Sequence, residues 1–125
     1  MNDLDISATD STPAVHSDWA AGWLEMTGDS YPENSFELFQ PVLDWLAAFL
    51  AGDTRALAVE LQLLYLNTSS VRAMMDIFDA LQEAHEGGRA VSVTWRYDRD
   101  NERVAELAAE FKEDYTFPFA IVPKA

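Results

Sequence analysis

The sequence predicts an α/β fold in which a mixed, mostly parallel sheet of about five strands is combined with three helices. Apolar residues alternate along some segments, as in strands, and recur at spacings of three and four along others, as in helices. In the second half of the chain the two kinds of segment follow each other in turn. This order favours right-handed crossovers between parallel strands.

The first part of the chain is predicted to form an antiparallel pair of strands. Residues 1–11 are polar and are expected to be a flexible arm or a short edge strand, followed by a single domain over residues 12–125. Within that domain, residues 12–19 and 22–27 are short extended candidates. Residues 28–34 are expected to be a loop, because this stretch is rich in Gly, Asp, Ser and Pro.

A first helix follows this loop and ends at Gly52. Its apolar residues at helical spacing are Phe36, Phe39, Leu43, Leu46 and Leu50. Pro41 lies inside the pattern, where it would remove one backbone hydrogen bond and clash with the preceding turn. The helix is therefore expected either to begin near Leu38 or to be kinked.

Residues 56–66 are predicted to be the central strand, covered on both faces. One face shows alternating apolar residues, and Leu64 and Leu66 make the other face apolar near its end. A second helix is expected from about Ser69 to Glu86, where two glycines end it.

The rest of the chain is predicted to add a strand, a helix and a strand. Residues 91–97 alternate, Asp100 or Asn101 caps the third helix, and residues 117–122 form the last strand. Three loops, at residues 28–35, 67–70 and 98–101, then leave the sheet at the carboxyl ends of its strands. Binding sites in open α/β sheets form at that edge.

Composition excludes several classes of function. The chain has 22 acidic and 8 basic residues and a net charge of −14, so it should repel nucleic acid and anionic membranes. It has no cysteine, and its start is acidic where a signal peptide would be basic. No apolar run approaches the roughly 20 residues of a membrane span. We expect a cytoplasmic protein without direct membrane insertion.

The turn Asn67-Thr68-Ser69-Ser70 joins the central strand to the second helix. Asn67, Thr68 and Ser69 are each good N-cap residues, and a cap alone would explain them. A phosphate on one of these hydroxyls would instead meet the free amides and the positive end of the helix dipole. From the residues alone, both interpretations remain open.

Other chemistry has weaker support. The run Gly28-Asp29-Ser30 is similar to the nucleophile block of one esterase class, but the next residue is Tyr31. The two histidines of the chain, His16 and His85, do not belong to any motif with Ser30. Asp98, Asp100 and Glu102 alternate as in a calcium loop, yet Arg103 stands where such a loop needs glycine. We therefore expect no metal and no cofactor.

Charged residues near the predicted edge have two interpretations. Arg99 and Arg103 could pair with a phosphate at the turn, or with the neighbouring Asp98, Asp100 or Glu106. Met75 lies near the polar boundary of the second helix and could face a partner. The acidic stripe on that helix is either a solvated face or a docking face. It consists of Asp76, Asp79, Glu83 and Glu86.

Several segments of the chain resemble the SiaC family of bacterial biofilm-regulating phosphoproteins. They are residues 28–35, 64–70, 73–77, 97–99 and 101–107. The resemblance covers nearly the whole chain and implies a STAS-like fold, related to anti-sigma-factor antagonists, for residues 12–125. It also implies that Thr68 is the phosphoacceptor, with Ser69 and Ser70 as alternatives.

The resemblance further implies a set of partners. Unphosphorylated protein would bind and activate a SiaD-like diguanylate cyclase, and a SiaB-like serine/threonine kinase and a SiaA-like phosphatase would set the phosphorylation state. The protein would thereby control cyclic-di-GMP signalling and biofilm formation. The predicted partner surface consists of Tyr31, Asn34, Ser35, Asn67, Thr68, Ser69, Arg72, Met75, Arg99 and Arg103.

Two alternative functions remain at this stage. The first is an anti-sigma-factor antagonist, which would be phosphorylated at the same turn. The second is a small serine hydrolase that uses Ser30 or Ser69, although no nucleophile has a base beside it in any motif.

Overall fold

The computed structural model describes residues 2–52 and 54–124. In these residues six strands form one sheet in the order β1-β2-β3-β4-β5-β6. The strands are β1 (Asp5–Ile6), β2 (Ala14–Asp18), β3 (Trp23–Ser30), β4 (Leu57–Leu66), β5 (Val91–Tyr97) and β6 (Phe119–Pro123). The helices are α1 (Ser35–Gly52), α2 (Thr68–Glu86) and α3 (Glu102–Glu113).

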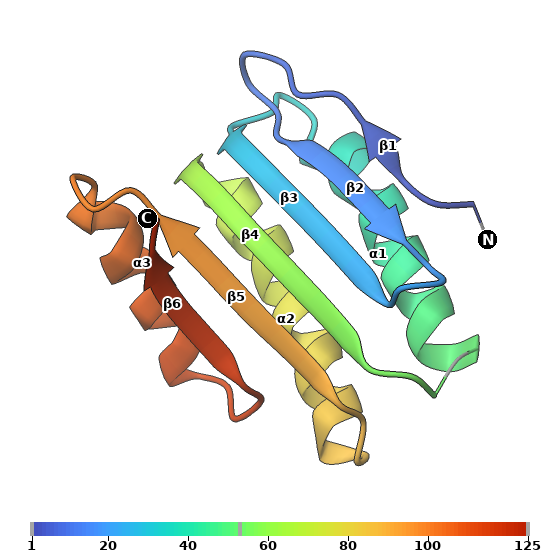
Figure 1. The fold of residues 1–125 in the computed structure, drawn as a ribbon. Coiled ribbons are helices and arrows are strands. Elements are labelled where there is room, and N and C mark those ends of the chain that lie inside the picture. The colour runs from blue at the N-terminus through green and yellow to red at the C-terminus, as the bar shows by residue number, and fades with distance from the viewer. Residues whose placement is uncertain (1, 53, 125) are drawn as a thin grey trace.

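The sheet is mixed, and neighbouring strands are also neighbours in sequence. β2 is antiparallel to both β1 and β3, whereas β3, β4, β5 and β6 are parallel to one another. Each helix connects two adjacent parallel strands (Figure 1). The α/β prediction is confirmed, with six strands where about five were expected, because the polar arm contributes β1 at the edge of the sheet.

Only one face of the sheet is covered by helices (Figure 1). In β4, Leu61 and Leu63 are buried, whereas Glu60 and Gln62 on the other face are half-buried. The prediction that this strand is covered on both sides is therefore wrong. Successive crossovers of one hand, each to the next strand along the sheet, place all their helices on the same face.

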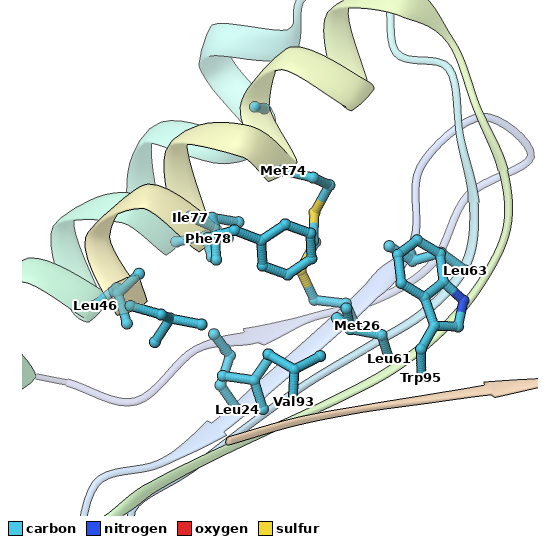
Figure 2. Close-up of a cluster of buried hydrophobic side chains, with 14 of the residues drawn as sticks. Leu24, Met26, Leu46, Leu61, Leu63, Met74, Ile77, Phe78, Val93 and Trp95 are labelled. Carbon is cyan, nitrogen blue, oxygen red and sulfur yellow. The ribbon is translucent and has the colours of Figure 1, made fainter. Parts of the chain in front are cut away.

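The core lies between the covered face of the sheet and the helices (Figure 2). Its buried members include Leu24, Met26, Leu46, Leu61, Leu63, Met74, Ile77, Phe78, Val93 and Trp95. The rings of Phe78 and Phe111 meet edge to face at 5.1 Å and join α2 to α3. Because full burial of one such side chain contributes about 1.5–3 kcal/mol, this layer fixes α2 on the sheet.

Helix α1 begins earlier than Leu38. The side-chain oxygen of Asn34 accepts the Glu37 amide at 3.1 Å, so the helix is capped at Asn34 and begins at Ser35. Pro41 lies inside the helix. The prediction of a start near Leu38 is wrong, because the buried side chains on both sides of Pro41 outweigh the one backbone hydrogen bond that proline removes.

The prediction of a loop from residue 28 is wrong for its first three positions, which continue β3. Gly28 has a φ of 121°, and the pairing with β4 shifts after it. Gly28 pairs with Leu63 and Asp29 pairs with Tyr65, so Leu64 is an extra residue in β4. Such a bulge changes the direction of nearby side chains, and here both Leu64 and Tyr65 are exposed.

Other boundaries differ by one or two residues. Helix α2 begins at Thr68, one residue before the predicted start, and β6 begins at Phe119. Asn101 occupies the N-cap position of α3, but its side chain makes no capping hydrogen bond. Pro118 has no amide to donate, which fits its place before β6.

Candidate functional site

The turn between β4 and α2 lies at the carboxyl edge of the parallel strands. Asn67 is the N-cap of α2, and its side-chain oxygen accepts the amide of Ser70 at 2.9 Å and the hydroxyl of Ser69 at 3.1 Å. Thr68 is therefore the first residue of the helix, where the unpaired amides and the helix dipole favour negative charge.

The three hydroxyls of this turn have different surroundings. Ser70 is fully buried, and its hydroxyl lies 2.7 Å from that of Ser30. Ser69 is exposed, but its hydroxyl is hydrogen-bonded to Ser35 and Asn67. Thr68 is exposed, and its hydroxyl has no hydrogen bond to any residue that the structure describes. Of the three, Thr68 is the exposed hydroxyl that makes no hydrogen bond with the described residues.

These hydrogen bonds tie three elements together. The amide of Asn67 donates to the carbonyl of Ser30 at 2.9 Å, so the turn is fixed to the end of β3 by backbone as well as by side chain. The bond between Ser35 and Ser69 joins the first turns of α1 and α2. The base of the turn is thus held on both sides, and Thr68 projects from a fixed position.

Five large apolar side chains are exposed in the part of the chain that the structure describes, and all of them come from segments at or near this edge. They are Tyr31 (43%), Phe36 (72%), Leu64 (46%), Tyr65 (56%) and Met75 (42%). We call these five side chains the apolar surface. The rings of Tyr31 and Tyr65 meet edge to face at 5.9 Å. Exposed apolar side chains that gather in one region indicate an interaction site.

Met75 is the member of the apolar surface that comes from α2, and Arg72 lies on the same helix. Arg72 follows Thr68 by four residues and Met75 follows it by seven, so both lie on the helix face of Thr68. Met75 is exposed, although the helical pattern places it mainly in the core, near the polar boundary. Arg72 is also exposed and lies one helical turn after Thr68.

Arg99 and Arg103 lie near the same edge but do not contact the turn. Both are exposed, and among the described residues neither makes an ion pair with Asp98, Asp100 or Glu106. The carboxylate of Asp98 instead accepts the amide of Asp100 at 3.0 Å. Neither of the two predicted interpretations of these arginines has a contact to support it.

The acidic stripe is partly engaged in internal contacts. Asp79 accepts the hydroxyl of Tyr115 at 2.8 Å, and Glu86 accepts the side-chain amide of Gln82 at 3.0 Å. Burial, together with the hydrogen bond to Asp79, raises the pKa of Tyr115 well above its usual range. This part of α2 therefore holds the segment after α3 in place.

The geometry does not support the hydrolase alternative. Ser30 is fully buried against Ser70, and the hydroxyl of Ser69 meets Ser35 and Asn67 rather than a histidine. His16 lies 3.2 Å from Asp5 at the β1–β2 edge. Across residues 2–52 and 54–124, no cluster of three or more potential metal ligands occurs, and no helix is long and apolar enough to cross a membrane.

Sequence reasoning missed three members of the apolar surface. Phe36 matched the helical core pattern, yet it is the most exposed of the five. The alternating pattern predicts Leu64 and Tyr65 to be buried strand residues, and both are exposed. A signal was present, because two adjacent bulky residues at the end of an alternating strand cannot both face the core.

This chain is similar to a known protein family, to a protein of known sequence and to solved structures. A family model described as SiaC family regulatory phosphoprotein matches residues 6–124. An uncharacterized protein of Pseudomonas aeruginosa (strain UCBPP-PA14) is 65% identical over 121 residues, which are 97% of this chain and 96% of that protein. The crystal structure of apo-SiaC from Pseudomonas aeruginosa is 63% identical, with a TM-score of 0.94 and coverage of 98% and 99% of the two chains.

A further solved structure contains a partner. It is the diguanylate cyclase SiaD in complex with its activator SiaC, from Pseudomonas aeruginosa. The matching chain is 64% identical and has a TM-score of 0.96. The match covers 98% of this chain and 100% of that chain.

Proposed function

This chain belongs to the SiaC family of regulatory phosphoproteins, and we propose that in its unphosphorylated form it binds and activates a diguanylate cyclase. The complex of the similar SiaC with SiaD supports this proposal. The protein would act in the cytoplasm, without catalysis of its own, and would control cyclic-di-GMP signalling and biofilm formation.

The apolar surface is the proposed binding site for the cyclase. Tyrosine is one of the residue types that contribute most to binding at interfaces, and Tyr31 and Tyr65 already pack against each other. Their positions need little ordering upon binding, because β4 and the end of β3 are fixed by the sheet. The cyclase should therefore present an apolar face here, bordered by neutral or basic residues that suit a chain of charge −14.

Phosphorylation of Thr68 is the proposed switch, with a dedicated kinase and phosphatase acting on it. A phosphate adds roughly −1.5 to −2 charges at a helix N-terminus that favours them, so the fold should tolerate it. Arg72, one turn along the same helix face, is the cation most able to pair with it. The cyclase interface would instead have to bury this charge, which costs about 2–5 kcal/mol.

One observation supports this assignment most strongly. Within the described part of the chain, Thr68 is the exposed hydroxyl of the turn without a hydrogen bond, and the exposed Leu64 and Tyr65 lie at the end of the strand before it. A kinase can reach this hydroxyl without opening the turn. The same residue is then placed to block a partner that covers its neighbours.

Activation of a purified cyclase tests the proposal. The chain, its Tyr65→Ser variant and a control variant, Thr116→Ala in the segment between α3 and β6, are each added to SiaD of Pseudomonas aeruginosa, and cyclic-di-GMP formation is followed. We expect activation by the wild type and by Thr116→Ala, and a loss of at least tenfold in apparent affinity for Tyr65→Ser, because burial of an aromatic anchor is lost. Wild-type chain that leaves SiaD inactive would contradict the proposed function.

A further inference from the structure

We infer that a cavity beside the apolar surface binds an arginine or lysine side chain of the partner, an inference that rests on the proposed function. The cavity measures about 610 Å³ and is lined by the N-terminal arm, the β3–α1 loop and the first turn of α1. The backbone amide of Tyr31 donates to the carbonyl of Ser11 at 2.8 Å and so ties the arm to the loop. The cavity is thus formed by segments that are joined to each other.

The charge of the lining favours a cation. Glu33 and Glu37 both line the cavity and are exposed, and neither forms an ion pair with another described residue. No lysine, arginine or histidine is among the described residues of the lining. A cationic group placed there would meet two carboxylates that lack a counter-charge.

The positive end of α1 does not cancel this preference. Asn34 already accepts the amide of Glu37, so one of the exposed donors of the first turn is satisfied. Glu37 is itself an acidic residue in that turn and compensates the helix dipole. The carboxylate of Glu33, on the loop before the helix, remains available to a partner.

The walls of the cavity suit a long side chain with an aliphatic stem. Ile6, Pro32 and Leu38 provide apolar contact, and Tyr31 also lines the cavity. Arginine and lysine bury their stems against apolar surface while the charged end reaches polar groups, and a cation is also attracted to an aromatic face. A small metal cation would use none of these walls.

Tyr31 connects this cavity to the proposed cyclase site. Its ring packs on Tyr65 in the apolar surface, and the same residue lines the cavity. A partner that covers Tyr31 and Tyr65 therefore contacts a residue that lines the cavity. The cavity would add a charge-dependent contact to the apolar one.

Paired charge neutralisation tests the inference. The Glu33→Gln/Glu37→Gln variant is compared with Glu110→Gln/Glu113→Gln on α3, which removes the same charge from exposed positions outside the cavity. The probe is purified SiaD of Pseudomonas aeruginosa, and its Kd is measured at low and at moderate salt. We expect the cavity variant to bind roughly three- to tenfold more weakly at low salt, with a smaller difference at higher salt. The control should match the wild type within about twofold.

Each outcome decides a separate point. If both double variants bind alike, whether unchanged or equally weakened, the cavity is not a cation site, while the proposed function stands. If the wild type itself fails to bind SiaD, the proposed function fails, and the inference fails with it. If thermal unfolding shows that the double cavity variant is misfolded, Glu33→Gln alone, on an exposed loop residue, is judged by the same criterion.

Discussion

At the scale of single residues, two buried hydroxyls fix the β4–α2 turn. Ser30 and Ser70 are fully buried and hydrogen-bonded to each other at 2.7 Å. Removal of one partner leaves the other buried and unsatisfied, so Ser70→Ala should cost about 1–3 kcal/mol in the free energy of unfolding. The double variant Ser30→Ala/Ser70→Ala should regain part of this loss, because no unpaired hydroxyl remains.

Denaturant unfolding of the wild type, Ser30→Ala, Ser70→Ala and the double variant measures the coupling free energy between the two hydroxyls. Ser7→Ala is the matched control, because Ser7 is exposed and its hydroxyl makes no hydrogen bond with another residue that the structure describes. It should change the free energy of unfolding by less than about 0.5 kcal/mol. A cost for Ser70→Ala no larger than that of Ser7→Ala would show that the buried pair does not hold the turn.

Tyr115 provides a prediction that depends on pH. Its hydroxyl donates to Asp79 at 2.8 Å, and burial and Asp79 raise its pKa above the ordinary value of 10.0. Because the folded pKa is the higher one, the stabilisation is complete below the unfolded pKa and is lost as pH rises above it. At about pH 8, Tyr115→Phe should lower the free energy of unfolding by about 1 kcal/mol, a value reduced for the partial exposure of the pair.

Denaturant unfolding of wild type and Tyr115→Phe at about pH 8 and about pH 11 tests the sign. The advantage of the wild type should shrink at the higher pH, because the unfolded chain alone gains from ionising this tyrosine. An advantage that grows with pH would contradict the assigned direction of the pKa shift.

At the scale of elements, Arg89 is the residue that caps the end of α1. The helix has no basic residue in its last turn. The guanidinium of Arg89, just before β5, donates to the carbonyls of Leu50 and Arg55, each at 2.9 Å, and lies 5.5 Å from the centre of the Phe49 ring. It thereby satisfies the Leu50 carbonyl in the last turn of α1, which the helix end leaves unpaired, and ties the loop residue Arg55 to it.

Arg89→Lys should therefore be destabilising although it keeps the charge. A lysine cannot reproduce the planar fork that reaches two carbonyls and stacks on a ring, so we expect a cost of about 1–3 kcal/mol in denaturant unfolding. Arg99→Lys, at an exposed loop position, should cost less than about 0.5 kcal/mol. Equal effects of the two substitutions would exclude the capping role.

The identity of the elements was predictable because it depends on local periodicity. The three helices and the strands from residue 12 onward follow from spacing, caps and glycines. Which face of β4 is covered was not predictable from its own residues, because it depends on the direction of the crossovers. The bulge at Leu64 also escaped prediction, since it depends on pairing with Gly28 on another strand.

The position of the candidate site was predictable from the sequence, but the difference among its hydroxyls was not. The hydroxyl-rich turn and the resemblance singled out residues 67–70. The difference between Thr68 and its two neighbours depends on Ser30 and Ser35, which are 40 and 34 residues away from their partners in sequence. Contacts of this kind exist only in the folded chain.

At the scale of the whole molecule, we predict one cooperative unit that needs no metal. The helices and the sheet share one apolar cluster, and no group of metal ligands occurs in the described residues. Thermal unfolding should show a single transition whose midpoint is unchanged by a chelator. Two separate transitions, or a midpoint lowered by several degrees with chelator, would contradict this prediction.

We propose that the chemical state of Thr68 decides whether the chain binds its cyclase. The most direct measurement is the Kd for SiaD of Pseudomonas aeruginosa with chain that is unmodified, or that carries phosphothreonine at residue 68 alone. Thr68→Ala serves as the control for loss of the hydroxyl, and circular dichroism verifies the fold of all three. We predict that unmodified chain and Thr68→Ala bind alike, and that phosphorylation weakens binding by roughly 30-fold to several thousand-fold. Equal affinity of the phosphorylated and unmodified proteins would contradict the switch.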